Sequence, residues 1–142
     1  MRSVADKMGI KARSKAHFVN APDEVMQALN LTDIELTEQL SGEFDYIHLF
    51  VIRQIEQESI FPKLKAKLKL EGMLWVSWPK GGQLGTDLSL PKVIKVGYNF
   101  GLVESTCLSI DSVWSAIKFT HPKKGKIYNN SHAELKSRTT ER

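Results

Sequence analysis

The chain has 142 residues, of which 42% are hydrophobic and 25% charged, a balance typical of one ordinary globular domain. No apolar run approaches the about 18 residues of a membrane helix, and the first residues, MRSVADKMGIKARSK, contain no apolar core of signal-peptide length. The single cysteine, Cys107, excludes an internal disulfide and a thiolate metal cluster within one chain. The sequence therefore predicts a cytoplasmic protein without membrane contact, in which Cys107 fills space in the core.

The net charge of +4 belongs entirely to the end of the chain. Residues 1–122 hold fourteen Lys or Arg against fourteen Asp or Glu, whereas residues 123–142 hold six basic residues against two acidic ones. This second segment is polar, has no periodicity and contains a single aromatic residue, Tyr128. We therefore expect one domain over 1–122 and a mobile basic tail over 123–142. Nucleic-acid binding is disfavoured, because one aromatic residue does not form a platform on which successive bases could stack.

The first part of the chain alternates strand and helix patterns. Residues 16–20 (AHFVN) form a short apolar run typical of a strand, and residues 20–30 (NAPDEVMQALN) predict a turn and then a helix of about two turns. In residues 31–39, Ile34 and Leu36 alternate with polar neighbours, which predicts a short strand at the edge of a sheet.

Two later segments are apolar on both faces. In residues 44–51 (FDYIHLFV), aromatic and histidine side chains alternate with aliphatic ones, and residues 73–79 (MLWVSWP) are similarly apolar. Strands that are buried on both faces occur in parallel sheets covered by helices on each side. We therefore predict that these two strands lie side by side and run in parallel.

The segment between these strands fits either a helix or a strand. Residues 53–70 (RQIEQESIFPKLKAKLKL) place four lysines in alternation with apolar residues, but their large apolar residues also have helical spacing. Helix is favoured, because Lys, Leu, Ala, Gln and Glu are strong helix formers. Pro62 lacks a backbone N–H, so a kink or restart is expected near it, and Glu71-Gly72 is expected to end the helix.

The last part of the chain predicts a helix and a hairpin. After a glycine-containing loop at 80–85 (KGGQLG), Ser89 is placed to cap a helix that ends near Gly101. Residues 102–110 and 113–121 are rich in β-branched and aromatic residues and are joined by a short turn, which predicts an antiparallel hairpin. The edge of this hairpin is a candidate surface for pairing with a second copy of the chain, as a homodimer.

The order of these elements predicts an α/β three-layer sandwich with a mainly parallel sheet and a C-terminal antiparallel hairpin. Four segments within it carry a resemblance: AHFVN, EFDYIHLF, LKLEGMLWVSWPK and LVESTCLSID…WSAIKF. They resemble the core of the class I S-adenosylmethionine-dependent methyltransferase fold, which is Rossmann-like, in shortened form. More narrowly, the motifs NAP, FD…LFV, LWVSWPK and WSA resemble a family of small bacterial proteins of unknown function. The resemblance covers residues 5–122 and implies the fold, S-adenosylmethionine as cofactor and methyl transfer as activity.

The turn after the first strand departs from the methyltransferase pattern. Such enzymes have a glycine-rich turn at this place, so that the backbone can approach the cofactor, whereas here the turn reads Asn20-Ala21-Pro22-Asp23. Pro22 removes an N–H that could have faced a ligand. The acidic residue that holds the ribose hydroxyls could be matched only by Glu35 or Glu38. The sequence therefore favours a domain without cofactor and without catalysis, and a methyltransferase with a non-standard site for S-adenosylmethionine is the alternative.

Ligands of open parallel sheets bind in the crevice outside the carboxyl ends of the strands. The candidate ligand-binding residues at these ends are Asn20, Asp23, Arg53, Ser77, Trp78 and Lys80. Arg53 and Lys80 would supply charge for a small anion, and Trp78 would supply a flat apolar wall. The other interpretation is that the two cations merely end buried strands as solvated charges.

Other chemistry is disfavoured by residue spacing. His48 lies in the middle of a strand, where a neutral core histidine is expected, and the remaining histidines show no ligand spacing with carboxylates, so no metal site is predicted. The serines lack a nucleophile elbow, and KGGQLG lacks the first glycine of a dinucleotide fingerprint. Three functions remain open: a non-catalytic methyltransferase-like domain that binds a small anion or a protein partner, a methyltransferase, and a structural protein without a ligand.

Overall fold

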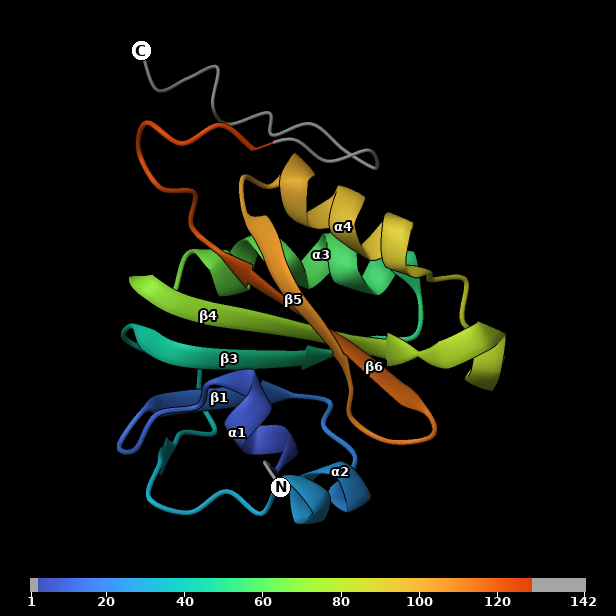
Figure 1. The fold of residues 1–142 in the computed structure, drawn as a ribbon, viewed down its shortest axis with the longest axis horizontal. Helices are drawn as coiled ribbons and strands as arrows, with labels where there is room; N and C mark the ends of the chain where they lie inside the picture. The colour runs from blue at the N-terminus through green and yellow to red at the C-terminus, as the bar shows by residue number, and fades with distance from the viewer. Residues whose placement is uncertain (1–2, 129–142) are drawn as a thin grey trace.

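The chain folds as a six-stranded mixed sheet with helices on both faces, and a computed structural model describes its residues 3–128 (Figure 1). In chain order the elements are α1 Val4–Met8, β1 Lys15–Val19, α2 Asp23–Leu29, β2 Glu35–Leu36, β3 Phe44–Phe50, α3 Gln54–Lys65, β4 Leu68–Pro79, the 3₁₀ helix η1 Lys80–Gly85, α4 Leu90–Asn99, β5 Val103–Ser109 and β6 Trp114–Thr120. Most of the predicted basic tail, residues 129–142, lies outside the described residues. Within residues 3–128, no helix has the length and apolar character needed to cross a membrane.

The strands lie in the order β2-β1-β3-β4-β6-β5. The first four are mutually parallel, and β6 runs antiparallel to both β4 and β5. The central prediction is confirmed, because Ile47 of β3 lies opposite Leu74 of β4 and Leu49 lies opposite Val76 in a parallel pair. The sheet is strongly twisted, and Figure 1 shows β5 and β6 running diagonally across the direction of β3 and β4.

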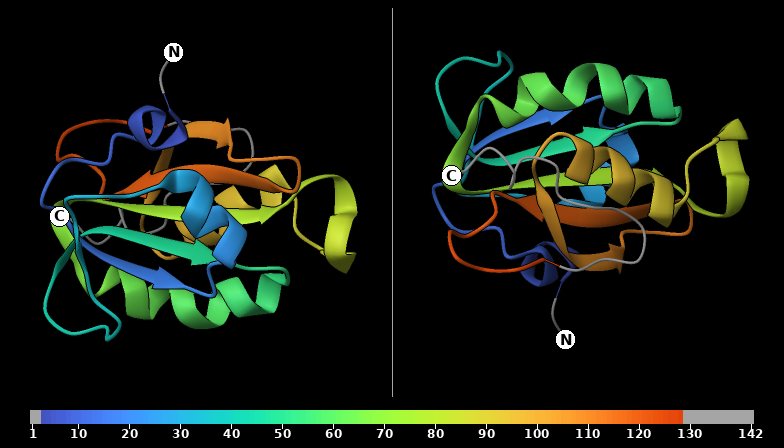
Figure 2. Two further views of the ribbon diagram at one scale, coloured as in Figure 1. Left: turned by 90° about the horizontal axis from the view of Figure 1, so that it is seen from below. Right: turned by 90° about the horizontal axis from the view of Figure 1, so that it is seen from above.

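Two apolar layers cover the sheet, one on each face. On one face, α3 and α4 pack Phe61, Leu64 and Val93 against the aliphatic side chains of β3 and β4. On the other, α1 and α2 cover a second buried cluster that includes Tyr46 and Trp75. Figure 2 shows α1 and α3 on opposite sides of the strands. The three-layer α/β sandwich is therefore confirmed, and it follows from strands whose alternate residues are apolar on both sides.

The boundary between α3 and β4 differs from the prediction. The helix ends at Lys65 rather than at Gly72, and Pro62 lies inside one helix instead of marking a restart. Residues 68–72 belong to β4 because this segment pairs with the start of β3. The pairing begins where the Phe44 N–H donates a hydrogen bond to the Lys67 carbonyl at 2.8 Å. Gly72 marks an irregularity in the β3–β4 register, where an added Cβ would lie 2.8 Å from the Phe44 carbonyl oxygen.

Two further features were not predicted correctly. Helix α1 was missed, although Ser3 caps it by accepting a hydrogen bond from the Asp6 N–H at 3.1 Å and Gly9 ends it with a φ of 79°. Cys107 is exposed rather than buried, because β5 is an outer strand and its register with β6 shifts between Glu104 and Cys107.

Candidate functional site

The carboxyl ends of β1, β3 and β4 form one edge of the sheet, which we call the carboxyl rim and define by residues 20–23, 51–53 and 77–80. These ends are level, because Val19 pairs with Leu49 and Leu49 pairs with Val76. The rim therefore contains all six residues that the sequence singles out, on three neighbouring strands. Their side chains, however, are engaged in very different ways.

The turn after β1 is exposed and left-handed. Asn20 has a φ of 58°, a conformation that glycine adopts most readily and that asparagine tolerates better than most residues. Asn20 and Asp23 are both exposed, and Pro22 precedes α2 at its N-cap position without a side-chain capping bond. The turn thus has the backbone shape of a glycine turn. It offers one backbone N–H fewer to a ligand, because Pro22 has none.

The Ser77 side chain lies in the interior, where it belongs to a buried chain of hydrogen bonds. The Tyr46 hydroxyl lies 2.7 Å from His48 Nδ1, and His48 Nε2 lies 2.7 Å from Ser77 Oγ. All three side chains are fully buried, and the imidazole stacks on Phe50 with ring centroids 4.3 Å apart. A neutral imidazole can donate one of these hydrogen bonds and accept the other, so the chain is internally satisfied.

The electrostatics of this buried chain are set by desolvation. Burial lowers the pKa of His48 to about 3 and raises the pKa of Tyr46 well above its ordinary value, since removing water disfavours the charged form of each group. His48 is therefore neutral at physiological pH, in keeping with its position in the middle of a strand. With Ser77 and His48 both enclosed, this pair is structural and is not exposed to a substrate.

Trp78 and Lys80 serve the packing of the C-terminal half. Trp78 is 5% exposed and belongs to the core cluster beneath α3 and α4. Lys80 Nζ donates hydrogen bonds to Ser109 Oγ and to the Asp111 carbonyl, and the Lys80 N–H donates to the Val113 carbonyl at 2.7 Å. Lys80 thus joins the end of β4 to the turn of the hairpin.

Replacing Lys80 with methionine is expected to lower the free energy of unfolding by about 1 kcal/mol, because the side chain is half-buried and loses two charge-assisted hydrogen bonds. Urea unfolding measures this change. Lys95→Met, at an exposed position on α4, is the control and should change stability by less than about 0.5 kcal/mol. Equal stability of the two variants would contradict the structural role of Lys80.

Arg53 is exposed and lies at the start of α3. Glu56 Oε1 accepts hydrogen bonds from the N–H groups of Ile52 and Arg53, at 3.1 and 2.9 Å, which fixes the turn between β3 and α3. The loop that follows η1, at the same edge of the sheet, covers this turn, since Thr86 donates to the Ile52 carbonyl and Asp87 accepts from the Gln54 N–H at 2.8 Å. These contacts could not be predicted from the sequence, because the partners lie more than thirty residues apart.

The two acidic residues near β2 lie at different depths along the sheet. Glu35 pairs with Lys15, which begins β1, so Glu35 lies toward the opposite edge. Glu38 follows the end of β2 and is exposed, but the last bond of this pairing, from the Thr37 N–H to the Ala16 carbonyl at 2.9 Å, reaches only the second residue of β1. The pairing therefore places neither acidic residue at the carboxyl rim. Within residues 3–128, no group of three or more His, Cys, Asp or Glu is placed to hold a metal ion.

Comparison with known proteins identifies the fold. No protein-family model and no curated protein sequence matches the chain. Among solved structures, it is similar to the ribosomal protein L11 methylase of Lactobacillus delbrueckii subsp. bulgaricus, with 15% identity, 84% of this chain and 75% of that chain covered, and a TM-score of 0.54. It is also similar to magnesium protoporphyrin IX methyltransferase from Synechocystis PCC 6803 with bound S-adenosylmethionine, with 7% identity, 83% of this chain and 74% of that chain covered, and a TM-score of 0.56. A TehB-like S-adenosylmethionine-dependent methyltransferase from Corynebacterium glutamicum has 12% identity, with 83% of this chain and 85% of that chain covered, and a TM-score of 0.54.

These likenesses define the class of fold. The chain has the class I methyltransferase-like, Rossmann-like α/β fold in truncated form. At identities this low, the comparisons establish architecture and leave the activity to be argued from the site.

Proposed function

We propose that the chain is a non-catalytic methyltransferase-like domain that binds a small anionic ligand at the carboxyl rim. The observation that carries this proposal is the exposure of Arg53 at the end of β3, beside the exposed turn that follows β1. In an open parallel sheet this edge is where ligands bind. A guanidinium in this position suits a carboxylate or a phosphate, which it can hold through two parallel hydrogen bonds.

The absence of catalysis is proposed from the side chains that this rim offers. A proton transfer needs a base within hydrogen-bond reach of the substrate. His48 and Ser77, which are bonded to one another near this edge, are fully buried. Lys80 is bonded to the hairpin turn. Of the exposed side chains of the candidate set, Asn20 and Arg53 cannot act as bases at neutral pH, and within residues 3–128 no hydrogen bond or ion pair orients the Asp23 carboxylate for proton transfer.

S-adenosylmethionine is the second candidate ligand, and one observation favours it. Asn20 adopts the left-handed conformation that a glycine turn would use, at the edge where ligands of such sheets bind. Against it, Pro22 lacks an N–H and α2 has only seven residues. The donor set therefore fits the cofactor in part, and we derive no methyl-transfer step from it.

Ligand titration with thermal unfolding tests the proposal. Small anions, common nucleotides, S-adenosylmethionine and its demethylated product are added to the full chain, since a ligand at a hundred times its Kd stabilises the native state by about 2.7 kcal/mol. An anionic ligand should raise the Tm, and Arg53→Ala should remove most of that increase. Lys63→Ala, another exposed cation of α3, is the matched control and should preserve it.

The other outcomes separate the three functions. A Tm increase with S-adenosylmethionine that Arg53→Ala preserves would favour the cofactor-binding alternative, and methyl transfer to any acceptor would overturn the non-catalytic assignment. No Tm increase with any compound would contradict the proposal and favour a structural protein without a ligand.

A further inference from the structure

A second concave site lies at the opposite edge of the sheet, where β1, β3 and β4 begin. It has a volume of about 460 Å³ and is lined by the turn between α1 and β1, by the first part of β4 and by the last part of β6. We call it the amino-edge pocket. Its charged lining residues are Lys11, Arg13, Asp45, Lys69, Glu71 and Lys118.

This pocket has a surplus of positive charge. Four cationic and two acidic side chains line the pocket. One cation and one carboxylate form an ion pair, because Lys69 Nζ lies 3.1 Å from Asp45 Oδ1. Within residues 3–128, the charged ends of Lys11, Arg13 and Lys118 form no hydrogen bond or ion pair, although the Lys118 ammonium lies 6.0 Å from the centre of the Trp75 ring. Three cations therefore remain against Glu71, and such a concave site attracts an anion with more than one negative charge.

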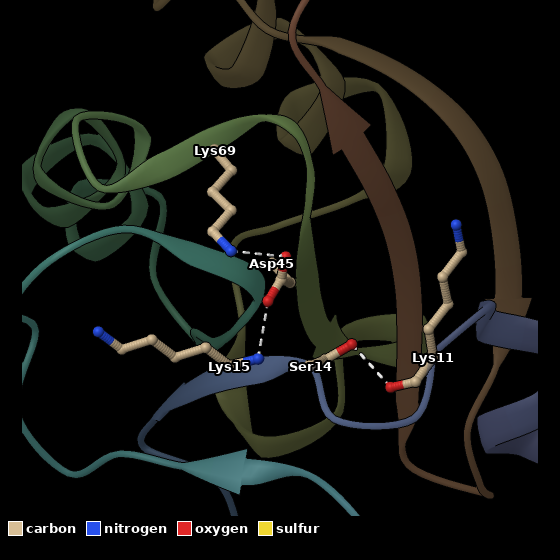
Figure 3. A network of polar contacts seen from close by, with 5 residues as sticks. All are labelled: Lys11, Ser14, Lys15, Asp45 and Lys69. Carbon is tan, nitrogen blue, oxygen red and sulfur yellow. Dashed lines mark hydrogen bonds and ion pairs between the residues drawn. The ribbon is translucent and has the colours of Figure 1, made fainter.

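The carboxylate inside the pocket is already neutralised. Asp45 accepts hydrogen bonds from the Lys15 N–H at 2.8 Å and from Lys69 Nζ at 3.1 Å, as Figure 3 shows. Partial burial raises the pKa of Asp45, but the Lys15 N–H and the Lys69 ammonium outweigh this effect and hold it below its ordinary value. Asp45 is thus an ionised partner of Lys69 and opposes an incoming anion less than a free carboxylate would.

The cations on the turn are held on a rigid backbone. Ser14 donates hydrogen bonds from its N–H and its hydroxyl to the Lys11 carbonyl, at 3.3 and 2.7 Å. Arg13 has a left-handed φ of 63°, and its N–H donates to the Asp33 carbonyl at 2.6 Å. In Figure 3 the Lys11 side chain extends away from the Asp45 contacts. Fixing the backbone in advance lowers the entropy lost when these side chains bind a ligand.

The neighbouring cavity continues this pocket. It has a volume of about 750 Å³, shares Glu71, Gly72 and Thr120 with the amino-edge pocket, and adds two further cations, Lys123 and Lys124. Its remaining wall contains apolar surface from Leu70 and Pro122 and the ring of His121. A molecule that spans both cavities would place charge in the first and an organic group against the second.

We propose that the amino-edge pocket binds the phosphate groups of a small phosphorylated molecule, with its organic part in the neighbouring cavity. Phosphate is favoured because it carries up to two charges per group and accepts hydrogen bonds from the fork of Arg13 and from lysine ammonium groups together. This site lies at the other edge of the sheet from the carboxyl rim and does not depend on any ligand bound there.

Isothermal titration of the full chain with pyrophosphate at low ionic strength tests the site, because salt screens such contacts. Wild-type protein should bind pyrophosphate, and Lys11→Gln/Lys118→Gln should weaken binding at least tenfold. Lys63→Gln/Lys95→Gln removes the same charge from exposed positions on α3 and α4 and should leave binding within twofold of wild type. Circular dichroism and the Tm show whether each double variant is folded.

Several results would overturn the inference. These are the absence of pyrophosphate binding by wild type, or an equal loss of affinity in both double variants, which would indicate a nonspecific charge effect. If Arg53→Ala abolished pyrophosphate binding while Lys11→Gln/Lys118→Gln did not, the anion site would be the carboxyl rim; the proposed function would then stand and this inference would fail. Adenosine diphosphate should bind more tightly than pyrophosphate, and equal affinities would overturn the assignment of the neighbouring cavity.

Discussion

Lowering the pH from 6.5 towards 3 is expected to destabilise the fold through His48, by up to about 1.4 kcal/mol per pH unit and about 5 kcal/mol in total. Burial lowers the pKa of His48 to about 3, whereas an unfolded chain has the ordinary value near 6.5. Between these values the unfolded state binds the additional proton. The stability contributed by neutral His48 is therefore complete above about pH 6.5 and is lost as the pH falls.

Urea unfolding at pH 7 and pH 4.5 measures this effect. Carboxylates such as Asp45, whose pKa is also lowered, act in the same direction at acid pH, so a reference variant is needed. His48→Gln retains a polar side chain but cannot titrate, and its loss of stability between the two pH values should be smaller than that of wild type by roughly 3 kcal/mol. In wild type, the imidazole NMR signals of His48 should not shift between pH 5 and 8. A titration near pH 6.5 would show that water reaches the ring and would refute the buried chain.

Gly97→Ala is expected to destabilise the protein by roughly 2–3 kcal/mol, although alanine is the better helix former. Gly97 lies on the face of α4 that packs on β6, and an added Cβ would lie 2.1 Å from Phe119 Cε1 and 2.6 Å from Phe119 Cζ. The Phe119 ring is fully buried and packs edge-on against Phe61 at 5.4 Å, so it cannot turn away at little cost. The clash between the added methyl group and the Phe119 ring is removed only if α4 moves away from the sheet.

The coupling between these two positions identifies the cause. In Gly97→Ala/Phe119→Leu, the smaller side chain makes room for the methyl group, so the double variant should be more stable than the sum of the two single losses predicts. Lys95→Ala on the exposed side of α4 should change stability by less than about 0.5 kcal/mol. A Gly97→Ala protein as stable as wild type would mean that α4 lies farther from β6 than the structure has it.

The burial pattern of the strands made much of the fold predictable. Residues 44–51 and 73–79 are apolar on both faces, and this pattern is compatible with few arrangements other than a parallel pair between helices. The hairpin of β5 and β6 was likewise visible in its two β-rich runs and short turn. These signals are local, since each depends only on which neighbouring residues share a face.

The end of α3 was predicted wrongly because local preference and tertiary pairing conflict there. Residues 68–70 have the composition of a helix, yet Leu68 pairs with Phe44 in the sheet. A strand partner satisfies the backbone groups of this segment, and helix propensity amounts to only tenths of a kcal/mol per residue. The helix therefore ends where the edge of β3 becomes available.

The sequence by itself determined the two central strand segments, the C-terminal hairpin and the edge at which the parallel strands end, because side-chain periodicity records burial. Only the tertiary structure decided what each rim side chain does. Ser77 bonds to His48, which precedes it by 29 residues, and Lys80 bonds to Ser109, 29 residues further on. The amino-edge pocket likewise combines residues from the α1–β1 turn, β3, β4 and β6. Contacts of this range depend on how the twisted strands are stacked, and no pattern of neighbouring residues encodes them.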